Sequence, residues 1–157
     1  MSASATAHAG ITNARVTHAE IKTIVNRITH DGSANQNLLD ESRVLHENSD
    51  AAIAAYARRE RSSDRHAWNQ DVHDQLMDAA MVLHTRMRIH DLASTTFRGL
   101  SMIGPEILGS ERNQLEDRHQ SQLHYNARMK CGDRWAELMS MAGVLRREYD
   151  VAHARVS

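Results

Sequence analysis

Apolar residues recur at helical spacing through most of this 157-residue chain. The first stripe consists of Ile21, Ile24, Val25 and Ile28, whose spacing of i, i+3, i+4 and i+7 places them on one face of an α-helix. The sequence Thr-His-Ala-Glu at 17–20 is a capping box and marks where this helix starts. Similar stripes follow further along the chain, so helix is the expected element almost throughout.

The composition disfavours a sheet. Val, Ile, Leu and Phe together supply 29 of the 157 residues, whereas alanine alone supplies 21. β-Sandwiches, β-barrels and doubly wound α/β sheets need more β-branched and aromatic residues, and more turns than one proline and seven glycines provide. No apolar run approaches the roughly 18 residues of a transmembrane helix. We therefore expect an all-α fold, an elongated bundle of four to five helices.

We expect a flexible tail at 1–15 and a single helical domain at 16–157. Gly32 is expected to end the first helix as a left-handed cap, Ser33–Gln36 to cap the second, and Gly132-Asp133 to break or kink the last apolar run. The polar stretch at 58–65 leaves open whether the second and third helices are continuous. The expected helices lie at about 17–30, 34–61, 64–97, 110–130 and 133–155.

Two neighbouring segments depart from this pattern. The segment Gly99–Gly109 is unusually apolar for a connection, so it either covers the open end of the bundle or docks a partner. In the next segment, Glu111–Gln122, only Leu115 is strongly apolar, which indicates a helix that is exposed and weakly stable or held by polar contacts with other chains. The interaction candidates from these segments are Leu100, Met102, Ile103, Pro105, Ile107, Leu108, Arg112 and Arg118.

Histidine is abundant, with 11 residues, but its spacing does not define a metal centre. The Glu-x-x-His run at 116–119 and the Asp-x-x-His run at 150–153 have the spacing of carboxylate-bridged di-iron bundles. The first lies in the most polar helix and the second at the C-terminal end. We expect no metal and no cofactor. The alternative, a metal-dependent helical-bundle enzyme, would draw on His46, Asp50, His90, Asp91, Glu116 and His119.

The sequence has no Gly-x-Ser-x-Gly, no phosphate-binding glycine loop and no Cys-x-x-Cys, so we assign no catalytic residue. Cys131 is the only cysteine, and we interpret it as a small buried hydrophobe. A single cysteine fits a reducing compartment, so the expected location is the cytoplasm, or an assembled particle or filament.

The charges almost balance, with 19 basic and 20 acidic residues. The chain therefore lacks the basic footprint of most nucleic-acid-binding proteins. A nucleic-acid-binding coat protein or regulator stays an alternative because a few arginines can line a phosphate groove. The preferred function is a non-enzymatic helical assembly or adaptor protein that binds itself or a protein partner through helix faces. Filament, coat and secretion-apparatus subunits are all of this kind.

Overall fold

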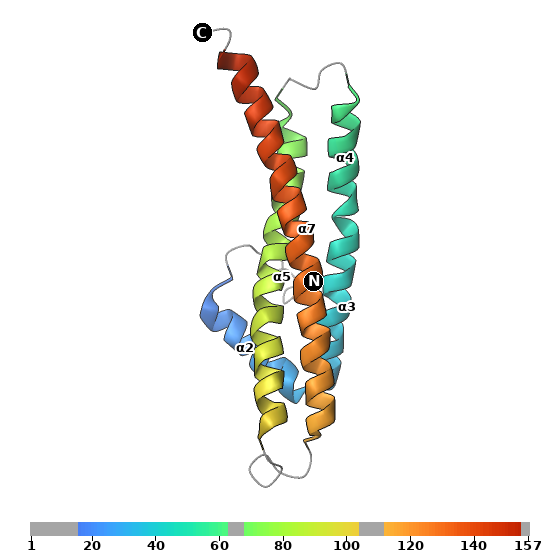
Figure 1. The fold of residues 1–157 in the computed structure, drawn as a ribbon, viewed down its shortest axis with the longest axis vertical. Helices are drawn as coiled ribbons and strands as arrows, with labels where there is room; N and C mark the ends of the chain where they lie inside the picture. The colour runs from blue at the N-terminus through green and yellow to red at the C-terminus, as the bar shows by residue number, and fades with distance from the viewer. Residues whose placement is uncertain (1–15, 63–67, 104–111, 155–157) are drawn as a thin grey trace, which may run out of the picture.

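The computed structural model describes residues 16–62, 68–103 and 112–154. These residues form five α-helices and no strand, which confirms the all-α fold and the elongated bundle (Figure 1). The tail expected at 1–15 lies outside the described residues. The helices are α2 (His18–His30), α3 (Gly32–Asn48), α4 (Asp50–Glu60), α5 (Gln70–Met102) and α7 (Gln114–Ala154).

Helices α5 and α7 form a long antiparallel pair that runs the length of the molecule (Figure 1). Helices α3 and α4 follow one another end to end and form a third rod beside this pair. Helix α2 packs obliquely against the lower half of α5 and joins α3 at the bottom of the view. Because α4 and α5 run in opposite directions, the expected helices 34–61 and 64–97 are not continuous.

Side-chain caps set the first two helix starts. Thr17 Oγ1 accepts a hydrogen bond from the Glu20 backbone N–H at 3.1 Å, which confirms the predicted N-cap. The prediction for Gly32 was wrong, because this glycine begins α3 instead of ending α2. Asp31 has extended backbone (φ −136°, ψ 102°) and its carboxylate accepts from the Ala34 N–H at 3.1 Å. One residue thus both ends α2 and caps α3.

The expected helix 34–61 is divided at Ser49 into α3 and α4. Ser49 keeps helical dihedrals (φ −67°, ψ −16°), so the chain direction changes little. Its hydroxyl donates to the His46 carbonyl oxygen, and such a side-chain bond competes with the helical backbone ladder. The next helix, α5, begins later than expected because Asn69 caps it by accepting from the Val72 N–H at 3.1 Å.

The two long helices also depart from the expected bounds. Helix α5 continues to Met102, so Leu100 and Met102 are helical and not part of a connection. The expected helices 110–130 and 133–155 are one uninterrupted helix, α7. A Cβ atom at Gly132 would lie 3.0 Å from Met87 Sδ. This glycine therefore allows close packing of α7 on α5 and does not break the helix.

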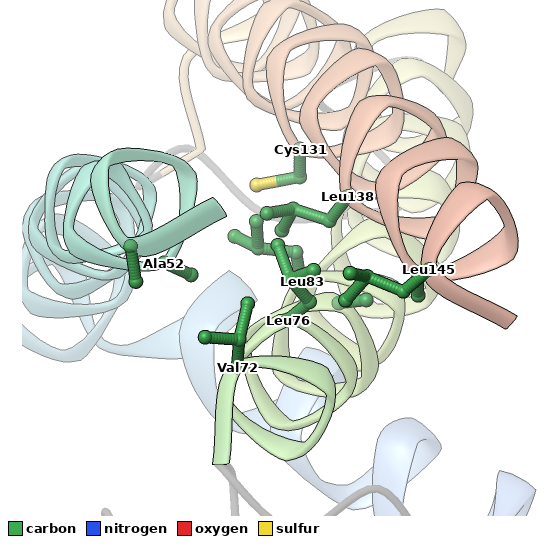
Figure 2. Close-up of a cluster of buried hydrophobic side chains, with 10 residues drawn as sticks. Ala52, Val72, Leu76, Leu83, Cys131, Leu138 and Leu145 are labelled. Atoms are coloured by element: carbon green, nitrogen blue, oxygen red, sulfur yellow. The ribbon is translucent and has the colours of Figure 1, made fainter. Parts of the chain in front are cut away.

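Two apolar clusters lie one above the other along the bundle. The upper cluster joins α4, α5 and α7, whose side chains point toward one another in Figure 2. It contains Cys131, which is 2% exposed, so the interpretation of this residue as a buried hydrophobe is confirmed; burial raises the pKa of its thiol to about 11. The lower cluster contains Val16, Ile21, Val25, Ile28, Leu38, Ile89, Ala93 and Phe97.

Candidate functional site

Fully buried polar side chains lie where α3, α5 and α7 meet. Arg86 and His90 of α5 and His124 of α7 all have no exposed surface. Burying such groups is costly unless each polar atom finds a partner. The hydrogen bonds of these three residues therefore decide what this part of the molecule can do.

Arg86 anchors one end of this arrangement to α3. Its Nη1 donates to Ser42 Oγ at 3.2 Å and to the Leu38 carbonyl oxygen at 3.3 Å, and its Nη2 donates to Glu41 Oε2 at 3.1 Å. Ser42 Oγ also lies 2.7 Å from His90 Nε2. Burial lowers the pKa of Arg86, and the hydrogen bond to Glu41 opposes this effect.

The two histidines continue the chain of contacts to the other side of the bundle. His90 Nδ1 lies 2.9 Å from His124 Nδ1, and His124 Nε2 lies 2.6 Å from Asn35 Oδ1. Asn35 Nδ2 donates to Gln120 Oε1 at 2.7 Å, and Gln120 Nε2 donates to Glu116 Oε1 at 2.8 Å. We call Arg86, Ser42, His90, His124, Asn35 and Gln120 the histidine network.

The donors and acceptors of the histidine network fix where its protons lie. Since Asn35 presents its carbonyl oxygen to His124, the proton of His124 is on Nε2 and its Nδ1 is an acceptor. His90 therefore donates from Nδ1 and accepts from the Ser42 hydroxyl at Nε2. Both rings are neutral, and all four ring nitrogens are engaged.

Burial keeps both rings neutral. It lowers the pKa of His90 well below 6.5, and the neighbouring His124 and Arg86 lower it further. Burial also lowers the pKa of His124 to about 4. Phe97 stacks on His124 with ring centroids 5.5 Å apart. The network thus joins three helices in one specific arrangement, with no ring nitrogen left for a reaction or a ligand.

The polar start of α7 is held by contacts within the chain. The sequence had left open that contacts with other chains hold this segment. Arg112 forms a double hydrogen bond with Asp117, at 2.9 and 3.0 Å, and donates to the Thr29 carbonyl oxygen at 2.7 Å. Ser94 and Ser121 each donate to the other's carbonyl oxygen, at 3.0 and 2.8 Å, and so tie α7 to α5. Arg112 was an interaction candidate, but its guanidinium is already engaged by bonds within its own chain.

A groove of about 500 Å³ follows the lower part of α5 and α7, and all of its lining residues in the described part of the chain come from these two helices. Its lining residues are Ser94, Arg98, Ser101, Met102, Arg118, Ser121, Gln122 and Tyr125. The structure therefore brings two interaction candidates, Met102 and Arg118, into one surface, the α5–α7 groove.

The α5–α7 groove is basic and partly apolar. Among residues 16–62, 68–103 and 112–154, those that line it include two arginines and no acid. Within the described part of the chain, no hydrogen bond or ion pair joins the guanidinium group of Arg98 or Arg118 to another residue. Met102 is 68% exposed and Tyr125 is 48% exposed. Sequence reasoning missed Arg98 and Tyr125, although Arg98 lies one helical turn before Met102 and Tyr125 lies two turns after Arg118.

The remaining interaction candidates contribute less. Leu100 and Ile103 are half-buried near the end of α5. Pro105, Ile107 and Leu108 lie outside the described residues.

The metal candidates lie apart and have other partners. Asp50 accepts from Arg134 at 2.6 Å, and Asp91 pairs with Arg128 at 2.8 Å. Glu116 accepts from Gln120, His90 belongs to the histidine network, and His46 and His119 lie at separate places on α3 and α7. Within residues 16–62, 68–103 and 112–154, no three His, Cys, Asp or Glu side chains could together hold a metal ion.

Comparison with protein-family models, curated proteins and solved structures finds no match to this chain. None of the helices described is long and apolar enough to cross a bilayer. The geometry of the groove and of the histidine network is therefore what bears on function.

Proposed function

We propose that this chain is a non-enzymatic helical assembly or adaptor protein that binds a protein through the α5–α7 groove. The observation that carries the proposal is a pair of guanidinium groups, Arg98 and Arg118, that have no partner among the described residues and line the same groove as the exposed side chains of Met102 and Tyr125. Arginine, tyrosine and methionine are enriched in protein interfaces, where they supply most of the binding energy or adaptable contact area.

The shape of the surface supports a helical ligand. Two long antiparallel helices flank the groove, and a further helix of a bundle packs into such a groove with its apolar and charged residues at i, i+3, i+4 and i+7. The buried histidines support a non-enzymatic function in another way, since both nitrogens of each ring are engaged and neither ring supplies a free base.

A photo-crosslinking residue at Tyr125 tests the proposal, with the same residue at Val44 as the control. Val44 is 45% exposed on α3, close to the 48% of Tyr125, but it does not line the groove. Purified protein and protein in its host cells are both irradiated. We expect a covalent protein adduct of defined mass from position 125, none from position 44, and loss of the adduct in the double variant Arg98→Glu, Arg118→Glu. Equal labelling from both positions, or none from either, contradicts the proposal.

A further inference from the structure

We propose that the protein bound in the α5–α7 groove is a second copy of this chain, which inserts the acidic first turns of its own α5. Copies would then join head to tail. This inference rests on the proposed function and adds the identity of the partner and the surface that it presents.

The partner surface is an acidic stripe at the start of α5. Asp71, Asp74 and Asp78 are spaced i, i+3 and i+7, so they share one face of the helix, and all three are exposed. Asp74 accepts from Gln70 at 2.6 Å. In contrast, the carboxylates of Asp71 and Asp78 have no hydrogen bond or ion pair to any described residue. Met81, which is 36% exposed, extends the same face by one turn.

The two surfaces are complementary in charge and in their apolar residues. The groove offers one arginine on each wall, Arg98 from α5 and Arg118 from α7, and neither guanidinium is paired with a residue that the structure describes. Carboxylates on successive turns of a docked helix can pair with both walls, and arginine–carboxylate pairs are well suited to interfaces. Met81 would then bring an apolar side chain to the groove that exposes Tyr125, a favourable sulfur–aromatic combination.

The two surfaces of one chain cannot meet each other. Asp74 and Arg98 both lie on the single helix α5, and a rise of 1.5 Å per residue separates them by roughly 36 Å. The start of α5, which carries the acidic stripe, lies toward one end of the bundle, whereas the end of α5 and the start of α7 lie at the other (Figure 1). The groove is lined by residues of these latter two segments. Because the contact joins two different patches, it is heterologous and propagates as an open chain or a ring instead of a closed two-fold dimer.

Sedimentation velocity of the purified full chain and of two charge-reversal variants tests the inference. The groove variant is Arg98→Glu, Arg118→Glu, and the stripe variant is Asp71→Lys, Asp78→Lys. The wild type is expected to form larger species as its concentration rises at low salt and to dissociate at high salt, since exposed ion pairs are screened. Each variant alone is expected to be monomeric, because its two surfaces then carry the same sign of charge.

Mixing the two variants is the decisive measurement. The acidic stripe of the groove variant is complementary to the basic groove of the stripe variant. The basic stripe of the stripe variant is likewise complementary to the acidic groove of the groove variant. The mixture is therefore expected to assemble like the wild type. The matched control, Asp40→Lys with Arg43→Glu, reverses an exposed pair on α3 and should assemble unchanged. Circular dichroism checks that every variant is folded.

The outcomes separate the inference from the proposed function. Assembly of either variant alone, or a mixture that stays monomeric, overturns the acidic stripe as the ligand. A monomeric wild type that still crosslinks from position 125 to a different protein overturns self-assembly and leaves the proposed function standing. A wild type that is monomeric and gives no adduct overturns both.

Discussion

His90 and His124 connect the folding of this protein to pH because both are neutral in the folded core. An unfolded histidine has a pKa near 6.5, whereas burial lowers the pKa of His124 to about 4 and that of His90 well below 6.5. Below pH 6.5 the unfolded chain therefore binds more protons than the folded one. The contribution of these two histidines to the free energy of unfolding is therefore fully present above pH 6.5 and is lost as the pH falls toward 4.

We expect the free energy of unfolding to fall by about 3 kcal/mol between pH 7 and pH 4 through His124 alone, at 1.36 kcal/mol per pKa unit. Urea unfolding at a series of pH values measures this slope. The double variant His90→Gln, His124→Gln should be less stable at pH 7 but have a flatter slope. His119→Gln is the control, since His119 is exposed on the same helix as His124. An unchanged slope in the double variant contradicts the assignment.

The burial of His124 was detectable in the sequence. His124, Cys131, Leu138 and Leu145 lie seven residues apart, and all four are buried. The apolar stripe of this helix, followed backwards from Cys131, therefore passes through His124. The sequence predicted that Cys131 is buried, but His90 was grouped with Asp91 as a metal candidate and His124 was not singled out. The pairing of His90 with His124 depends on the packing of α5 against α7, which local spacing does not specify.

At the scale of the helices, the α2 N-cap was predictable because it depends only on neighbouring residues, Thr17 and Glu20. The continuity of α7 was not, because Gly132 acts through Met87 on another helix. In the same way, the polar start of α7 finds its partners on α2, α3 and α5, as the bond from Arg112 to Thr29 illustrates. The continuity of α7 and the partners of its polar start depend on packing between helices, which neighbouring residues in the sequence do not specify.

Two helical glycines should respond differently to alanine. A Cβ at Gly99 meets nothing within 4 Å, so Gly99→Ala should raise the free energy of unfolding by about 0.5–1 kcal/mol through helix propensity. A Cβ at Gly132 would lie 3.0 Å from Met87 Sδ, so Gly132→Ala should gain less, and Gly132→Leu should destabilise by about 1–3 kcal/mol. Urea unfolding compares the three variants. Equal gains from both alanines would show that Gly132 is not at a close contact.

At the scale of the whole molecule, α5 joins the two apolar clusters. Helices α5 and α7 both run without a break past the upper cluster and the histidine network, and α5 continues into the lower cluster. The sequence predicted an elongated bundle from the lengths of its helices, but not that a polar layer would lie near the boundary between two apolar clusters. Such a layer either separates the molecule into two folding units or couples them.

We expect coupling, because separating the halves would break α5 and leave the network residues without partners. Trp135 packs against the upper cluster, whereas Ile21 lies in the lower one. Ile21→Ala should cost about 2–5 kcal/mol and lower the urea midpoint equally by tryptophan fluorescence and by circular dichroism. Leu138→Ala, in the upper cluster, is the matched control and should also shift both signals together. An early loss of circular dichroism in Ile21→Ala, with the fluorescence transition unmoved, would mean that the two clusters unfold separately.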